Sequence, residues 1–142
     1  MLLFQNNLAA QDQLTDKGGY TVNVKEEHSF LFVLANRPGD LQEVRTGITK
    51  YIWKYHPEGK LKITQIAIDG ELTDMPLIHI TGFSDKAQAM AFFNGLKQNR
   101  PDFMQMGMTK DYFALSKTNY EKIVRAKSLA GYKAFFEQNY LK

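Results

Sequence analysis

Cysteine is absent from the 142 residues of this chain. Its absence excludes disulfide bonds, thiolate nucleophiles, cysteine-ligated zinc and CxxC redox chemistry. It leaves the compartment open, because proteins of oxidising compartments can also lack cysteine. The length predicts one domain that buries roughly 70% of its unfolded surface, so that no metal or disulfide is needed for stability.

Long apolar runs are missing as well. No stretch approaches the roughly 20 apolar residues that a membrane-spanning helix needs. The first five residues, MLLFQ, have no basic region, and their apolar run is too short for a signal peptide. If the natural protein is exported, we therefore expect this chain to be a fragment of it.

A strong excess of one charge is also lacking. The 18 basic and 15 acidic residues give a formal net charge of +3, which is too balanced to indicate a nucleic-acid-binding protein. The third predicted strand, LIHITGF over residues 77–83, lacks the RNP1 pattern with which RNA-recognition domains stack bases on their sheet. We therefore expect no nucleic-acid partner.

Sequence signals of catalysis are few. The chain contains no GxGxxG, GxxxxGK[ST], GxSxG or SxxK motif. Its three histidines, His28, His56 and His79, show neither HxH nor HExxH spacing. We predict no catalytic residues, metal or cofactor, and we interpret the chain as a non-enzymatic domain.

Apolar periodicity and turn residues predict four strands and three helices. The expected strands cover 29–35, 61–68, 77–83 and 112–116. The expected helices are 40–55 with Asp40 as N-cap, a second between a Ser84 cap and Asn99, and a last one from a Ser128 cap to about residue 140. The basic stretch between the last strand and Ser128 is expected to be irregular.

The order of these elements predicts the fold. Two right-handed crossovers in the order β-α-β-β-α-β generate an α+β, ferredoxin-like split βαβ sandwich with antiparallel strand order 4-1-3-2. An extra C-terminal helix follows. We place this interaction domain at residues 28–142 and interpret residues 1–27 as a polar linker or tether, with a short strand considered over 20–24.

The sheet offers the main candidate surface. The first strand is apolar on both faces, so if Leu31 and Val33 point to the helices, its other side chains form an apolar patch on the opposite face. The C-terminal helix, the tether, a second copy or a partner must then cover this patch. The residues predicted to bind a partner there, if the face is open, are Phe30, Phe32, Leu34, Leu77 and His79.

Two other clusters leave alternatives open. Three carboxylates, Asp69, Glu71 and Asp74, crowd the loop before His79, where a small-ligand site or an active site would need a pocket. A solvated turn explains them more simply. Residues 104–108, MQMGM, suit packing against the core, a soft copper ion or an adaptable contact surface.

Three ordered segments carry a resemblance to a known family. They read LIxIxxFSDKxxAxxFFN over 77–94, YFALSxxNYxxI over 112–123 and YxxFFxxNY over 132–140. The chain resembles the C-terminal domain of tetratricopeptide-repeat lipoproteins of the Bacteroidetes envelope, the PorW/SprE-like group. The resemblance covers roughly residues 26–142. It implies a periplasmic or outer-membrane-associated scaffold in type IX secretion or gliding motility, with an envelope protein as partner.

A weaker, fold-level similarity points to SPOR domains. It rests on the same element order and on the Gly82-Phe83-Ser84 junction that leads into the second helix. SPOR domains bind peptidoglycan on an open sheet face. Peptidoglycan binding is therefore the alternative function that the sequence leaves open.

Overall fold

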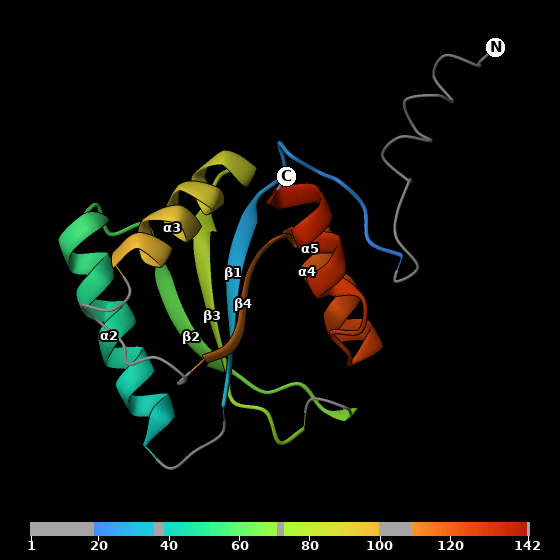
Figure 1. Ribbon diagram of the computed structural model, residues 1–142, viewed down its shortest axis with the longest axis horizontal. Helices are drawn as coiled ribbons and strands as arrows, with labels where there is room; N and C mark the ends of the chain where they lie inside the picture. The colour runs from blue at the N-terminus through green and yellow to red at the C-terminus, as the bar shows by residue number, and fades with distance from the viewer. Residues whose placement is uncertain (1–18, 36–38, 71–72, 100–108, 142) are drawn as a thin grey trace.

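The computed structural model describes residues 19–35, 39–70, 73–99 and 109–141 (Figure 1). Eight helices and strands follow one another in these ranges. They are β1 (His28–Leu34), α2 (Asp40–Tyr55), β2 (Lys62–Ile66), β3 (Leu77–Phe83), α3 (Lys86–Asn99), β4 (Thr109–Ser116), α4 (Lys117–Ala126) and α5 (Tyr132–Tyr140).

The four strands form one antiparallel sheet in the order β2-β3-β1-β4. This is the strand order predicted from the two crossovers, and the α+β, ferredoxin-like architecture with a C-terminal helical addition is confirmed. The register of β2 is regular from Lys62 to Ile66. Its half-buried Ile63 and Ile66 therefore point to opposite faces of the sheet, without a bulge between them.

Helices cover both faces of the sheet. Helices α2 and α3 lie on one face, and α4 and α5 lie on the other (Figure 1). On the first face the Phe30 ring packs 5.1 Å from the Phe92 ring of α3. On the second face the Phe113 ring lies 5.4 Å from the Tyr132 ring of α5, edge to face. The chain's own C-terminal helices thus provide the cover that the sequence left undecided.

The predicted orientation of Phe30, Phe32 and Leu34 is wrong. The register pairs Phe32 with Ile78, and pairs Leu31 with His79, and side chains directly opposite each other share a face. Phe30, Phe32 and Leu34 therefore point toward α2 and α3. Leu77 and His79 do lie on the opposite face, as predicted, but α4 and α5 cover that face.

All five of these residues are buried, so the open face on which their predicted role depended is not present, and the faces assumed for β1 were misassigned. The cause is that β1 is buried along its whole length, and a strand without polar alternation gives no phase from which to assign its faces. Whether any of the five contacts a partner is not tested by the structure and stays a prediction.

Helix α4 occupies the stretch between the last strand and Ser128, which was predicted from the sequence to be irregular. Ser116 caps it, because its Oγ accepts a hydrogen bond of 3.1 Å from the Asn119 N–H. Only Asn119 and Ile123, four residues apart, are buried on this helix. Such a narrow buried stripe explains why apolar periodicity alone does not reveal α4.

The helix caps differ from the predicted ones. Helix α2 has Gly39 as N-cap, with Asp40 as its first residue. The Asp85 Oδ1 atom, rather than Ser84, accepts the bond from the Gln88 N–H at the start of α3. The N-cap of α5 is Gly131. Each helix thus exists where predicted, but its first turn is shifted by one to three residues.

Residues 19–27 lie against the C-terminal helices. Tyr20 is buried, and its ring meets the Tyr132 ring edge to face at 5.0 Å. The Asn119 side chain accepts from the Thr21 N–H and donates to the Thr21 carbonyl oxygen. The Glu26 carboxylate accepts two bonds from Thr118, both of 2.7 Å. The strand considered over 20–24 is not formed, and the segment is fixed by contacts with α4 and α5 instead.

Gly82 forms a β-bulge in β3. Ser29 pairs with Thr81 and His28 pairs with Phe83, so Gly82 is an extra residue between the two pairs. Its φ of 121° is strained for any residue with a side chain, and an added Cβ would collide with the backbone carbonyl of Lys60. The bulge lets the loop before β2 approach β3 closely.

We predict that Gly82→Ala lowers the free energy of unfolding by about 2 kcal/mol or more, because it adds both backbone strain and a backbone collision. Gly59→Ala is the matched control. Gly59 also has a positive φ, but nothing lies within 4 Å of its added Cβ, so we expect a loss of about 1 kcal/mol. Urea denaturation of both variants measures the difference, and equal losses would contradict the role of the Lys60 contact.

Candidate functional site

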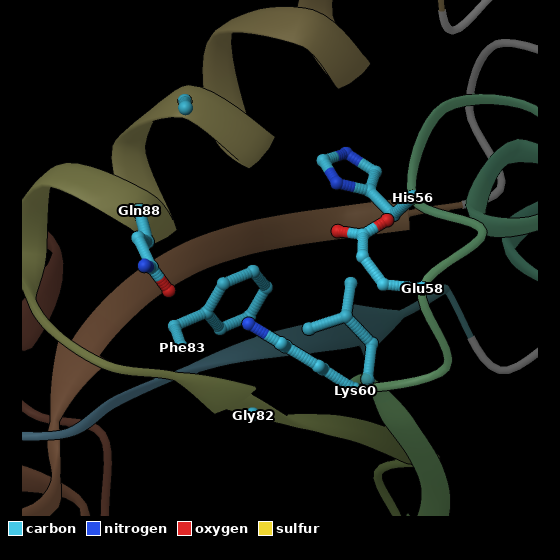
Figure 2. Close-up of a pocket in the computed structure, with 8 residues that line it drawn as sticks. His56, Glu58, Lys60, Gly82, Phe83 and Gln88 are labelled. Atoms are coloured by element: carbon cyan, nitrogen blue, oxygen red, sulfur yellow. The ribbon is translucent and has the colours of Figure 1, made fainter.

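A first cavity of about 250 Å³ lies between the loop before β2 and helix α3. Figure 2 shows His56 and Glu58 on one wall and Gln88 on the opposite wall. The Gln88 side-chain oxygen already accepts a bond of 2.9 Å from the Ser84 N–H. Glu58, Lys60 and Gln88 are exposed, so their remaining polar atoms are accessible to solvent. This cavity contains polar groups, but its geometry does not demand a ligand.

His56 belongs to the aromatic core as much as to this first cavity. Its ring lies 5.6 Å from the Tyr51 ring and 5.3 Å from the Phe92 ring. Burial among these rings lowers its pKa, and the charge of nearby Glu58 opposes that shift. A neutral imidazole packed on aromatic rings is well explained by its structural role.

A second cavity of about 250 Å³ lies on the α4/α5 face of the sheet, where β1, β3 and the start of α4 meet. We call it the His79 pocket. Its lining residues are Glu27, His28, Ser29, His79, Thr81, Lys117, Tyr120 and Glu121. Glu27, Lys117 and Glu121 are exposed and form the rim, whereas Ser29 and His79 are buried in the sheet below.

Two of the residues that line this pocket each have a polar side-chain atom that is buried without a hydrogen-bond partner. These atoms are Ser29 Oγ and His79 Nε2, in residues that are 6% and 8% exposed. An unsatisfied buried polar group costs about 1–3 kcal/mol, so native proteins contain few of them. Two such atoms in residues that line the same cavity make the His79 pocket the candidate functional site.

The His79 imidazole is held in place and uncharged. Its ring stacks on the Tyr120 ring with centroids 4.1 Å apart and planes 5° apart. Burial lowers the pKa of His79 to about 4 and raises the pKa of Tyr120. At neutral pH the stack therefore consists of a neutral imidazole, with one N–H donor and one acceptor nitrogen, and a neutral phenol.

His28 lines the same pocket, but both of its ring nitrogens are bonded. Nδ1 lies 2.8 Å from the Glu26 carbonyl oxygen, and Nε2 lies 2.7 Å from the Tyr140 hydroxyl. Burial lowers the pKa of His28. A carbonyl can only accept, so neutral His28 carries its proton on Nδ1 and accepts at Nε2 from Tyr140. His28 therefore links the start of β1 to the end of α5 by a hydrogen bond.

The pocket does not have the geometry of nucleophilic catalysis. Ser29 and His79 are diagonal neighbours on paired strands, but the Ser29 hydroxyl makes no hydrogen bond to the imidazole. A serine nucleophile needs such a bond to a base. Within the described ranges, no group of three His, Asp or Glu side chains is arranged to hold a metal ion.

One of the residues predicted from the sequence to bind a partner lines this pocket. Of the five predicted partner-binding residues, only His79 lines it. Ser29 and Tyr120 were not predicted. The sequence signal for this pocket was a serine and a histidine within two otherwise apolar strands. That Ser29 and His79 lie close together depends on the strand register, and the position of Tyr120 depends on α4, which the apolar pattern did not reveal.

The carboxylate cluster lies elsewhere. Asp74 lines a separate cavity with Leu34 and Lys110, at the opposite end of the sheet from Ser29 according to the register. It is therefore not part of the His79 pocket. Glu71 and the methionines of segment 104–108 lie outside the described residues.

Comparisons with protein-family models, curated proteins and solved structures give no match for this chain. Of the helices that the structure describes, none has the length and apolar character to cross a membrane.

We predict that stability depends on pH through His79. Its folded pKa of about 4 lies below the unfolded value of 6.5, so the unfolded state binds more protons between these values. The stabilisation is complete above about pH 6.5 and is lost as pH falls toward 4, at up to about 1.4 kcal/mol per pH unit. Lowered pKa values of His28 and His56 add slopes of the same sign.

Urea denaturation between pH 4 and 8 tests this dependence on the wild type and on His79→Phe, which keeps an aromatic ring against Tyr120. The variant should lose the His79 contribution and show a shallower slope between pH 4 and 6.5. Identical slopes in the two proteins would show that His79 titrates alike in the folded and unfolded states.

Proposed function

We propose that this chain is a non-enzymatic protein-interaction module. It would serve as a scaffold domain of an exported, periplasmic or outer-membrane-associated protein linked to type IX secretion or gliding motility, with an envelope protein as its partner. The observation that carries the interaction role is the His79 pocket, in which Ser29 Oγ and His79 Nε2 are buried without partners. The envelope setting is inferred from the resemblance alone.

Three features favour binding over catalysis. Ser29 lacks a hydrogen-bonded base, and the pKa of His79 at about 4 lies far from the neutral range in which a general base works best. The two buried polar residues of the pocket, Ser29 and His79, also belong to strands rather than to a loop. A preset, rigid pocket is suited to holding a group of a partner in one position.

The residues that carry the family resemblance are largely structural. Tyr132, Phe135, Phe136 and Tyr140 form the buried side of α5. The Tyr132 hydroxyl donates a bond of 2.7 Å to the Ala114 carbonyl oxygen of β4. The resemblance therefore supports a shared fold with the C-terminal helix closed onto the sheet, and the His79 pocket lies beside this closure.

Peptidoglycan binding of the SPOR type has less support. That mode needs an open sheet face, and α4 and α5 cover it here (Figure 1). Phe83, in the junction that suggested the similarity, is buried with its ring 5.3 Å from the Phe92 ring. The covered sheet face and the buried Phe83 therefore disfavour peptidoglycan binding.

Photo-crosslinking in the organism that produces this protein tests the interaction role. A photoreactive amino acid is placed at Lys117 or Glu121 on the pocket rim, and at the exposed Lys50 of α2 as a control. We expect both rim positions to give an adduct with the same envelope protein, which Lys50 does not give. The His79→Phe variant should reduce this adduct.

Other outcomes would contradict the proposal. The photoreactive amino acid is also placed at the exposed Trp53 of α2. Adducts at Trp53 but at neither rim position would place the partner contact on α2. Pelleting of the purified domain with peptidoglycan sacculi, reduced by His79→Phe and accompanied by no protein adduct, would replace the proposal with glycan binding.

A further inference from the structure

We infer that the His79 pocket receives a neutral carboxamide, the side chain of a glutamine or asparagine of the protein partner. This inference rests on the proposed interaction role and specifies the chemistry of its contact. Ser29 Oγ and His79 Nε2, which are buried in the free chain, would be the two atoms that recognise the amide after a small side-chain movement opens them to the pocket.

The buried end of the pocket favours a neutral group. Ser29 and His79 are uncharged there, and the charged side chains Glu27, Lys117 and Glu121 are all on the exposed rim. A carboxylate or an ammonium group that entered would lose its hydration without meeting a buried counter-charge, which is costly. Two of the three rim charges are also negative, which further disfavours a carboxylate.

The pairing of the two buried atoms favours a group with a donor and an acceptor side by side. Ser29 and His79 are diagonal neighbours across β1 and β3, with Cα atoms roughly 7 Å apart by strand geometry. The serine hydroxyl can donate or accept, and Nε2 does one or the other according to the tautomer. A carboxamide offers both N–H and C=O, so it can satisfy the pair in either tautomer.

The size and rigidity of the pocket agree with a side chain. Its volume of about 250 Å³ exceeds the share of a single water, about 30 Å³, so a lone hydroxyl would leave most of it unfilled. The stack of Tyr120 on His79 fixes the direction of the imidazole before any ligand arrives. A pre-oriented polar group reduces the entropy that binding must overcome.

The test is an NMR titration of the isotope-labelled chain with capped amino acids, the N-acetyl methylamides of glutamine and asparagine. The same derivatives of glutamate and methionine are the matched probes, because they keep the size and replace the carboxamide by a charged or an apolar group. Signals of the His79 ring nitrogens and of the Ser29 and Thr81 amides report the pocket. The His56 ring reports the first cavity as an internal control.

We expect saturable shifts at His79 with the glutamine or asparagine probe, with a dissociation constant in the millimolar range, as is typical of a single small group. The glutamate and methionine probes should bind roughly tenfold more weakly, and Ser29→Ala should weaken the carboxamide probes by a similar factor. His56→Phe should leave their binding unchanged.

Equal binding of the glutamate or methionine probe would overturn the inference, and so would the absence of a response to every probe, as when water alone fills the pocket. Stronger binding of N-acetylglucosamine would point to a glycan.

A protein adduct at the rim without carboxamide preference would remove this inference and leave the proposed function standing. Carboxamide binding without any partner adduct would support the carboxamide preference of the pocket and remove the proposed function. If His79→Phe does not fold, Ser29→Ala replaces it in the crosslinking experiment.

Discussion

The complete burial of β1 is the constraint on which the rest of this structure depends. All seven of its residues are buried, and β3 and β4 flank it on both sides. A strand with apolar side chains on both faces requires cover on both faces. Helices α2 and α3 provide one layer, as in any ferredoxin-like sandwich, and the chain supplies α4 and α5 as the second.

The second layer is held by polar bonds as well as by apolar contact. The Tyr140 hydroxyl reaches His28 at the start of β1, and Lys86 at the start of α3 donates to the Asn139 carbonyl oxygen at 2.9 Å. The Lys86 ammonium group also lies 4.7 Å from the centre of the Tyr140 ring, within the range of a cation–π interaction. Aromatic rings such as Tyr132 and Phe136 pack α5 against Phe113 of the sheet, and these bonds specify where α5 ends.

Much of the fold was predictable because the apolar pattern of each element agrees with the order in which the elements follow one another. Three of the four strands and the helices α2, α3 and α5 have clear apolar patterns, and the crossover rule then leaves few topologies. The faces of β1 were not predictable, since Phe30 and Leu31 are equally apolar. They were settled by aromatic packing, in which Phe30 meets Phe92 of α3. Helix α4 was not predictable either, because its polar sequence becomes helical only with the Ser116 cap and the sheet beside it.

The candidate site was less predictable than the fold. His79 could be singled out as a polar residue in an apolar strand, but the sequence gives no indication that Ser29 lies diagonally from it or that Tyr120 stacks on it. Both relations depend on strand register and on helix packing, which are tertiary properties. The conspicuous carboxylates Asp69 and Asp74 belong to the loop before β3, and Asp74 lies at the opposite end of the sheet from Ser29.

The pocket lies where the second layer stops covering the sheet. Tyr120 covers one side of His79, while the exposed side chains of Lys117 and Glu121 border the opening. An apolar residue in place of Ser29 or His79 would remove a desolvation cost of about 1–3 kcal/mol for each unsatisfied group. The strands thus retain two groups that reduce the stability of the free chain. A partner that satisfies both groups recovers that free energy, whereas a partner that cannot form the bonds leaves the cost in place. In the proposed interaction the same two atoms would supply both affinity and discrimination, and both belong to strands of the buried core.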